Sequence, residues 1–158
     1  MNDSEAVRLV EWDARYAEAS VAMWRASKAR ALGIEEAHSF DDHVYFLTEI
    51  LALSDEIWLA LAGERVVGLL ATDGEFVNQL YIHVDYQRLG IGSRLLGLAK
   101  ARSAGRLQLR SFEVNVVARR FYEAHGFEIV GCGDDNEEGL PDILYRWQRA
   151  DPGDENER

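Results

Sequence analysis

Cysteine and proline are scarce in this chain, which has one cysteine and two prolines among its 158 residues. The single cysteine, Cys132, cannot form an internal disulfide, and disulfide frameworks are typical of secreted proteins. The first residues are acidic and lack the basic and then apolar order of a secretion signal. Together these features predict a cytoplasmic protein in which Cys132 is a small buried residue.

The chain also lacks a long apolar run, because no segment approaches the roughly 18 residues that a membrane-crossing helix needs. Basic residues are outnumbered, with 17 Lys and Arg against 28 Asp and Glu and a formal net charge of −11. Proteins that bind nucleic acid usually gather Lys and Arg on one face. We therefore expect neither a membrane partner nor a nucleic-acid partner. The excess of acid keeps a protein in solution, and a negative field also attracts cationic substrates.

The rest of the composition is ordinary for a globular protein, with 47% apolar and 28% charged residues. No internal repeat, low-complexity tract or linker divides the chain. We therefore expect a single domain over residues 1–150, followed by a polar tail over residues 151–158.

Apolar spacing and turn residues predict alternating helices and strands. The first third is expected to contain a strand over 6–11, a helix from Asp13 to about residue 32 and a second helix from Ser39. Further strands are expected over 57–61, 66–72, 76–84, 107–112, 127–132 and 143–148, with helices over 90–104 and 115–125. This order predicts an α+β fold with a mixed, largely antiparallel sheet of six to seven strands and helices on both faces.

A glycine-containing segment, Gln87-Arg88-Leu89-Gly90-Ile91-Gly92, lies between an apolar strand and an amphipathic helix. Glycine permits positive φ and close backbone approach, so successive N–H groups can converge on one anion at the helix start. A dinucleotide fingerprint is excluded because positions 95 and 110 hold leucine and arginine, and a P-loop because Gly-Lys-Ser/Thr is absent. The segment alone predicts either phosphate binding or an ordinary turn. If it binds phosphate, bulk at Gly92 is expected to block the anion while leaving the core intact.

The run Leu80–Leu96 places Gln87, Gly90 and Gly92 directly after a strand. This arrangement is similar to the central motif of the GNAT acetyltransferase family, Q/R-x-x-G-x-G/A after a strand. Further along, the run Asn115–Phe127 is similar to the family's second motif, N-x-x-A-x-x-F-Y-x-x-x-G-F. Order, spacing and strand–helix context agree over residues 56–148, whereas the preceding segment matches only in general layout. The resemblance predicts an acetyl-coenzyme A-dependent transferase with that family's fold.

In this family two central strands diverge, and the pantetheine arm of the cofactor pairs with one of them like an added strand. The resemblance places the arm on the backbone of Leu80–Ile82 and the pyrophosphate on the N–H groups of Arg88–Ser93. The cofactor contacts that it implies are Leu80, Tyr81, Ile82, Gln87, Arg88, Leu89, Gly90, Ile91, Gly92, Ser93 and Asn115. The chain departs from the pattern at Arg88, where glycine is frequent, and at Val84, where proline is common. Neither change removes a backbone donor, and no metal is implied.

Tyr122 is the expected catalytic residue, because the family's tyrosine at this place is a general acid toward the departing thiolate of CoA. A phenol is protonated at pH 7, and its pKa is only about 1.5 units above that of a thiol, so donation to sulfur is chemically reasonable. Glu75 is the acid nearest to the family's strand glutamate and is the candidate general base. However, an offset of one residue turns a strand side chain to the opposite face. His83, or water acting on an amine that arrives neutral, is the alternative.

Other polar residues have simpler explanations. Asn115 is expected to cap its helix, with or without a contact to the cofactor. His125 suits a helix C-terminus, where a cation is favoured. The acidic loop over residues 133–141 is either a solvated surface or a contact for a cationic substrate.

The resemblance predicts direct transfer of an acetyl group from acetyl-CoA to a primary amine in a ternary complex. The acceptor is a small molecule or a peptide, which the sequence does not distinguish. The competing interpretation is a non-catalytic CoA-binding module that regulates or binds a partner. The intact Tyr122 disfavours this alternative, and the missing strand glutamate keeps it open. Members of the family often form dimers, so a homodimer is one assembly that the resemblance allows.

Overall fold

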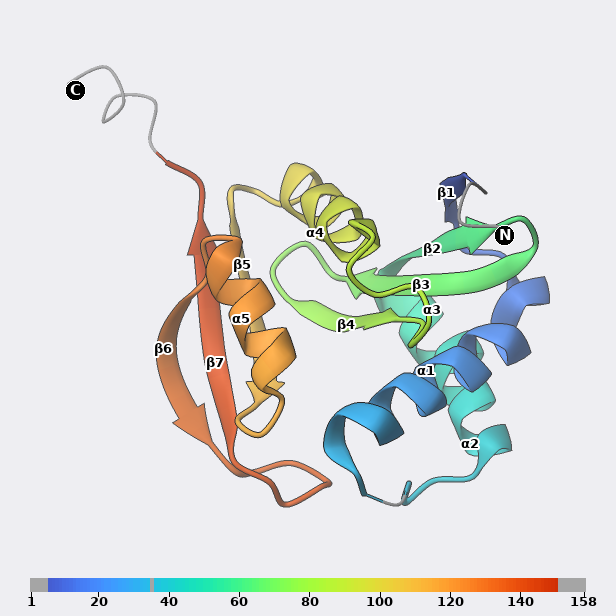
Figure 1. The fold of residues 1–158 in the computed structure, drawn as a ribbon, viewed down its shortest axis with the longest axis horizontal. Helices are drawn as coiled ribbons and strands as arrows, with labels where there is room; N and C mark the ends of the chain where they lie inside the picture. The colour runs from blue at the N-terminus through green and yellow to red at the C-terminus, as the bar shows by residue number, and fades with distance from the viewer. Residues whose placement is uncertain (1–5, 35, 151–158) are drawn as a thin grey trace.

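The computed structural model describes residues 6–34 and 36–150, and the elements follow the predicted order (Figure 1). The strands are β1 (Val7–Glu11), β2 (Glu56–Ala62), β3 (Arg65–Thr72), β4 (Val77–Ile82), β5 (Arg106–Phe112), β6 (Glu128–Gly133) and β7 (Asp142–Gln148). The helices are α1 (Ala17–Leu32), α2 (Phe40–Tyr45), α3 (Ala52–Ser54), α4 (Ile91–Arg102) and α5 (Val116–Ala124). The predicted polar tail over residues 151–158 lies outside the described residues.

The strands form two antiparallel sheets instead of one continuous sheet. The first sheet has the order β1-β2-β3-β4, and the second has the order β5-β7-β6. They are joined where Phe76 forms a parallel bridge with Gln108 and the Gln108 N–H donates to the Glu75 carbonyl at 2.8 Å. Beyond this bridge β4 and β5 diverge, as Figure 1 shows. The prediction of a largely antiparallel α+β fold is confirmed, and this bridge supplies the parallel component.

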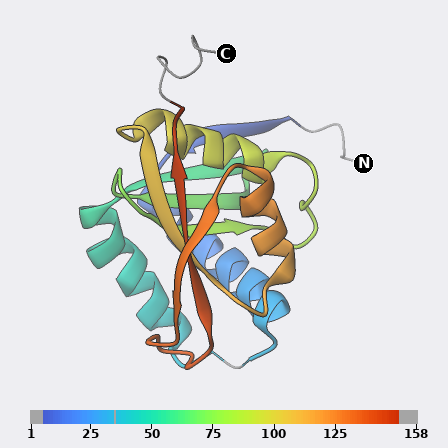
Figure 2. The same cartoon turned by 90° about the vertical axis from the view of Figure 1, so that its left-hand side faces the viewer.

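Helices pack on both faces of the first sheet (Figure 2). The segment from α1 to α3 covers one face, where Leu69 of β3 is buried, and α4 covers the other, where Leu70 is buried. Burial on both faces explains the continuous apolar sequence of β3. Among the helices of the described residues, none combines the length and apolar character needed to cross a membrane.

The N-terminal helices begin and end at the predicted capping residues, with two changes. The Asp13 side chain accepts a hydrogen bond from the Arg15 N–H at 3.0 Å, but it caps a 3-10 turn, and α1 begins only at Ala17. Gly33 ends α1 with φ +66°. The Ser39 side chain caps α2, and the helical segment then continues through a π-helical turn, Phe46–Leu51, into α3.

The strand before the glycine segment ends at Ile82, two residues earlier than predicted. The His83 N–H makes the last ladder bond to β3, to the Val67 carbonyl at 2.9 Å. The His83 carbonyl then accepts from the Tyr86 N–H at 2.9 Å, which closes a turn. His83 therefore belongs to the turn that leads from β4 toward α4.

The prediction that Cys132 is buried is wrong. Cys132 lies on β6, which is an edge strand of the second sheet, and its side chain is exposed. Alternating apolar residues predict a strand but do not reveal whether that strand lies at the edge or in the centre of a sheet.

Candidate active site

The start of α4 presents backbone donors without partners. Gly90 is the N-cap residue, with φ +86° and ψ 2°, and no side chain caps the helix. The N–H groups of Ile91, Gly92 and Ser93 have no carbonyl one turn earlier, because the first turn of a helix has none before it. The Arg94 N–H is bonded within the helix start, to the Gly90 carbonyl at 3.1 Å. These uncapped donors and the helix dipole suit an anion such as a phosphate.

Arg88 adopts a left-handed backbone conformation with φ +66°. Among the described residues it is the only non-glycine residue with positive φ. This conformation costs about 1–2 kcal/mol for a residue with a Cβ atom, and such strained residues cluster at functional sites. Together with Gly90, Arg88 gives the segment the left-handed conformations from which anion-binding concavities are built.

Gly90 and Gly92 are glycines for different reasons. A Cβ atom at Gly90 would meet nothing within 4 Å, so its positive φ is what requires glycine there. A Cβ atom at Gly92 would lie 3.2 Å from Cζ of Phe121 on α5 and 3.7 Å from Cγ1 of Ile82. The expectation that bulk at Gly92 would leave the core intact is therefore wrong, because a side chain there first meets the Phe121 ring.

His125 connects the end of α5 to the start of α4. Its Nε2 lies 2.9 Å from the Ser93 Oγ, and its Nδ1 lies 2.8 Å from the Phe121 carbonyl oxygen. Because a carbonyl only accepts, Nδ1 carries the hydrogen in that bond. His125 is the C-cap residue of α5, so the predicted helix terminus is confirmed. Its contact with Ser93 was not predicted, because it depends on the packing of two helices that are separate in sequence.

One edge of β4 pairs with β3, and the other edge is open toward the second sheet. The His83 N–H donates to the Val67 carbonyl, and hydrogen-bonded pairs alternate along an antiparallel ladder. By this alternation the backbone groups of Tyr81 are turned toward β3. Those of Leu80 and Ile82 are turned toward the open edge. Leu80 and Ile82 are therefore the residues that can offer backbone groups to an added chain.

The Ile82 carbonyl at this edge already accepts two side-chain hydrogen bonds. It accepts hydrogen bonds from the Ser27 Oγ of α1 at 3.0 Å and from the Gln87 Nε2 at 3.3 Å. Ser27 thus ties α1 to the end of β4, and Gln87 folds the following loop back onto it. These two contacts fix the geometry between the open edge and the start of α4.

Tyr122 lies on α5 with 8% of its surface exposed. Its ring packs against Phe127 and Tyr145, with centroid separations of 5.9 and 6.2 Å. Burial raises the pKa of the Tyr122 hydroxyl well above its ordinary value. The pKa of Tyr81 on β4 is also raised, first by burial and then by the nearby Tyr122 hydroxyl. The structure therefore brings Tyr122 to the end of β4 that leads into the glycine segment.

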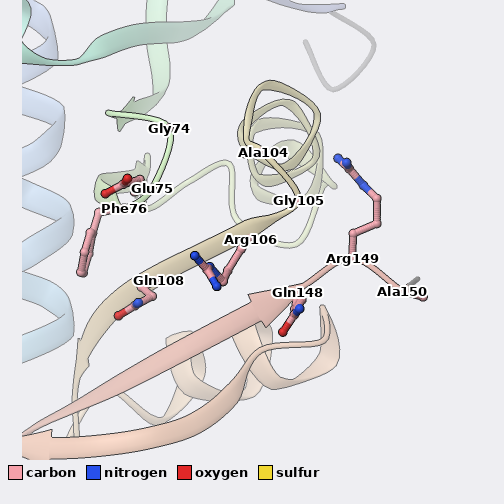
Figure 3. A pocket seen from close by; sticks show the side chains of 10 residues that line it. All are labelled: Gly74, Glu75, Phe76, Ala104, Gly105, Arg106, Gln108, Gln148, Arg149 and Ala150. Carbon is pink, nitrogen blue, oxygen red and sulfur yellow. The ribbon is translucent and has the colours of Figure 1, made fainter. Parts of the chain in front are cut away.

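Glu75 lies at the opposite end of β4, in the turn that precedes the strand. It is exposed and lines an open surface cavity of about 570 Å³ together with Arg106 and Gln108 (Figure 3). A strand of six residues, which spans about 20 Å at about 3.3 Å per residue, separates Glu75 from the loop after Ile82. The structure does not bring Glu75 together with Tyr122.

Asn115 caps α5, as predicted. Its Oδ1 accepts a hydrogen bond from the Ala118 N–H at 3.2 Å. This bond satisfies one of the free donors at the helix start. A contact between Asn115 and the cofactor stays a prediction.

A polar cluster that the sequence did not reveal lies beside Tyr81. Trp24 of α1 stacks on Tyr81 and on His43 of α2, with centroid separations of 5.8 and 4.7 Å. The Lys28 Nζ lies 2.6 Å from the Glu138 Oε2 in the acidic loop between β6 and β7. No local pattern marks this cluster, because its members come from four separate segments. Within residues 6–34 and 36–150, no three His, Cys, Asp or Glu side chains are arranged to hold a metal ion.

Residues 54–129, which contain β4, the uncapped start of α4 and Tyr122, match a family model described as an acetyltransferase (GNAT) domain. The chain contains a GNAT acetyltransferase domain. The predicted family and the predicted acyltransferase class are confirmed.

Two curated relatives of this GNAT domain carry names that state an activity. The peptidyl-lysine N-acetyltransferase YiaC of Escherichia coli is 24% identical over 126 residues, which cover 79% of this chain and 86% of YiaC. The peptidyl-lysine N-acetyltransferase YjaB of Salmonella typhimurium is 28% identical over 130 residues, which cover 78% of this chain and 85% of YjaB.

Solved structures show the same GNAT fold. The solution structure of apo YjaB from Escherichia coli has a TM-score of 0.71 at 21% identity, and covers 92% of this chain and 99% of that one. PaiA N-acetyltransferase from Thermoplasma acidophilum, crystallised in complex with coenzyme A, has a TM-score of 0.70 at 16% identity. That match covers 90% of this chain and 99% of PaiA.

Proposed function

We propose that this protein transfers an acetyl group from acetyl-CoA to the side-chain amine of a lysine in a peptide or protein. One observation carries the proposal. The backbone groups of Leu80 and Ile82 face an open strand edge that leads directly into the uncapped start of α4. The names of YiaC and YjaB support lysine as the acceptor, and the PaiA complex supports coenzyme A as the carrier.

The residues present fit coenzyme A. The Leu80 carbonyl and the Ile82 N–H, both at the open edge, can pair with the amide groups of a pantetheine arm, whereas the Ile82 carbonyl already accepts from Ser27 and Gln87. The pyrophosphate fits the free N–H groups of Ile91, Gly92 and Ser93 and the left-handed turn at Arg88. The Arg88 side chain adds a positive charge beside that anion. Gln87 holds this loop against β4 through the Ile82 carbonyl. The backbone groups of Tyr81 are paired with β3, so the predicted pairing of its backbone with the arm is wrong.

Two groups of the chain divide the work of the transfer. When bound, acetyl-CoA supplies an acetyl thioester, whose C–S bond breaks as the amine nitrogen forms an amide bond. The Leu80 N–H, at the open edge, is placed to donate to a carbonyl oxygen on which negative charge develops. The Tyr122 hydroxyl gives its proton to the departing sulfur, and the proton that the nitrogen loses as the amide forms restores the hydroxyl, directly or through water. Burial raises the pKa of Tyr122, so this hydroxyl is protonated at neutral pH and is a weaker acid than an exposed phenol.

The proton of the incoming ammonium is assigned to water. Glu75, the predicted base, lies at the joined end of the two sheets, away from Tyr122 and the start of α4. A lysine ammonium is deprotonated only in small part at pH 7, so the observed rate is expected to rise with pH up to the pKa of the acceptor. Replacing Glu75 by glutamine should then leave this pH profile unchanged.

The deciding experiment measures cofactor binding and transfer separately. Isothermal titration with CoA gives the dissociation constant, and release of free thiol from acetyl-CoA in the presence of lysine peptides gives turnover. Tight CoA binding with lysine-dependent thiol release supports the proposal. Tight CoA binding without transfer to any peptide would favour the alternative, a CoA-binding module, and absence of binding at millimolar CoA would reject the cofactor.

A further inference from the structure

The side chains of Ser93 and His125 meet where α5 ends against the start of α4. The Ser93 Oγ lies 2.9 Å from the His125 Nε2, and the His125 Nδ1 lies 2.8 Å from the Phe121 carbonyl oxygen. Ser93 is exposed and His125 is half-buried. Because each ring nitrogen has one hydrogen-bond partner, the protonation state of the ring decides where the hydrogen atoms of this pair lie.

With a neutral ring, the Ser93 hydroxyl has no hydrogen left for a ligand. A carbonyl oxygen only accepts, so the Nδ1 of His125 carries the ring hydrogen and the Nε2 has a lone pair. The hydroxyl of Ser93 must then donate its one hydrogen to Nε2. Its oxygen can offer only lone pairs to a ligand, and an anion cannot use them.

One added proton reverses the direction of this hydrogen bond. A protonated ring carries hydrogen on both nitrogens, so the His125 Nε2 donates to the Ser93 Oγ. The hydroxyl hydrogen of Ser93 is then free, on the same residue as one of the N–H groups that have no carbonyl one turn earlier. Protonation of His125 therefore gives the start of α4 a further donor and a positive charge, and both favour an anion.

The charged groups near His125 leave its ring without a counter-charge. From α4, the Lys100 Nζ donates to the His125 carbonyl at 2.7 Å, and the Arg94 guanidinium is directed away to a carbonyl of β1. On α5, the Glu123 carboxylate is held at 2.6 Å by a tyrosine hydroxyl of β7. In the part of the chain that the structure describes, no carboxylate forms an ion pair with the His125 ring.

The two helix ends act on this ring in opposite directions. The C-terminus of α5 favours a cation, whereas the N-terminus of α4 opposes one. The Phe121 ring also lies beside the imidazole, with a centroid separation of 4.4 Å, and an aromatic ring next to a cation is a favourable neighbour. An anion bound at the start of α4 offsets the opposing effect of that helix. Anion binding and protonation of His125 therefore favour each other.

We propose that Ser93 and His125 form a proton-linked pair for the diphosphate of the cofactor. His125 takes up a proton from solvent as the diphosphate binds, and the Ser93 hydroxyl donates to a phosphate oxygen. The inference rests on the proposed function, because it concerns how the cofactor of that function is held. His125 acts through Ser93 and is thus a positioning residue. No covalent bond forms or breaks, and the proton returns to solvent when the cofactor leaves.

The test is calorimetric titration of wild type with dephospho-CoA. This probe keeps the diphosphate but lacks the 3′-phosphate, and a phosphate monoester itself loses a proton near pH 6. Because binding takes up a proton, the dissociation constant should rise with pH, by about 5- to 10-fold between about pH 6.5 and 8.0. Titrations at one pH in buffers of different ionisation enthalpy should show a net uptake of no more than one proton. Neither measurement needs a variant.

Two variants assign the proton to this pair. His125→Gln keeps a hydrogen-bonding side chain beside Ser93 that does not titrate, and Ser93→Ala removes the hydroxyl. Each should weaken binding about 10-fold at about pH 6.5, as expected for a charge-assisted hydrogen bond, and much less at about pH 8.0. A pair that only held α4 against α5 would weaken binding equally at both pH values. Ser93→Thr keeps the hydroxyl and should retain the wild-type pH dependence.

His83 provides the matched control, because it lies in the turn before the glycine segment. Its Nδ1 accepts from the Asp85 N–H at 3.0 Å. His83→Gln should keep the pH dependence of wild type. A dependence that is lost in His83→Gln and persists in His125→Gln would overturn the proposal.

The outcomes separate this inference from the proposed function. Binding of dephospho-CoA that does not change with pH and takes up no proton would overturn the pair alone. Absence of binding would overturn the cofactor assignment as well. The expected pH dependence without acetyl transfer to any lysine peptide would refute the proposed function and leave the pair standing.

Discussion

The hydroxyl of Tyr122 combines burial with a position near the end of β4. We predict that Tyr122→Phe lowers single-turnover acetyl transfer by about 10²- to 10⁴-fold, the usual contribution of a general acid. The phenyl ring keeps its packing against Phe127 and Tyr145, so CoA affinity should barely change. Single-turnover kinetics are required, because slow product release would hide a smaller effect. Unchanged transfer in a folded variant would leave Tyr122 as a packing residue.

His43 of α2 is a second residue whose environment has a measurable consequence, because burial lowers its pKa and makes the stability of the fold depend on pH. Burial lowers the pKa of His43 below its ordinary value of 6.5 and outweighs the raising effect of Glu36, while Arg25, Lys28 and His38 lower the pKa further. The unfolded chain therefore binds a proton at higher pH than the folded protein does. Stability from this group is fully present above about pH 6.5 and is lost as pH falls below it.

We predict that His43→Phe flattens this dependence, because phenylalanine can still stack on Trp24 but does not titrate. Urea unfolding between pH 7.5 and 5.5 gives the measurement, and the wild-type free energy of unfolding should fall with a slope of at most about 1.4 kcal/mol per pH unit from this group. Any loss of packing in the variant lowers the free energy of unfolding equally at both pH values. Identical slopes in variant and wild type would show that His43 is not the titrating group.

At the scale of elements, Gly90 and Gly92 at the start of α4 have different roles, because only Gly92 packs against α5. Gly92→Ala places a methyl group 3.2 Å from the Phe121 ring, which precedes Tyr122 on α5. We predict a stability loss of about 1–3 kcal/mol from overpacking, together with slower transfer as α5 shifts. Gly90→Ala has open space but an unfavourable φ, so it should distort the turn and mainly weaken CoA binding.

The matched pair is measured by thermal unfolding, CoA titration and single-turnover transfer. The essential result is a different pattern in the two variants, with transfer affected more in Gly92→Ala and CoA affinity affected more in Gly90→Ala. If both variants lose CoA affinity equally and keep the transfer rate, then the contact between Gly92 and Phe121 has no bearing on Tyr122.

At the scale of the whole molecule, two sheets joined through one parallel bridge are held together by helices and by the ion pairs at their far ends. A ligand that pairs with β4 and reaches α4 adds contacts that only the folded protein can make. At a concentration about 100 times the dissociation constant, CoA should stabilise the fold by about 2.7 kcal/mol. For a domain of this size we predict a rise in melting temperature of about 5–10 °C. Dephospho-CoA and free pantetheine are suitable controls, because pantetheine lacks the pyrophosphate and should give a much smaller shift.

The sequence by itself determined the order of the elements, the glycine-containing start of α4 and the place of Tyr122 on α5. These features depend on local signals: glycine next to a helix, apolar residues at the spacing of strands and helices, and polar caps such as Ser39 and Asn115. The spacing of the motifs placed these features correctly even though the predicted end of β4 was two residues too late. Local signals also explain why the largely antiparallel α+β fold was predictable.

The tertiary structure alone decided how these pieces meet. The resemblance had predicted that two central strands diverge, and the structure showed that they are β4 and β5, joined by one bridge beside Glu75, so that Glu75 and Tyr122 lie at opposite ends of β4. It placed His125 on Ser93, Phe121 against Gly92, and Lys28 on Glu138, a contact across 110 positions of the chain. Such contacts produce no periodic pattern in the sequence, because they depend on which faces of the helices and sheets pack together. Charge patterns marked the loop around Glu138 as acidic, and only packing against α1 placed Lys28 on the Glu138 carboxylate.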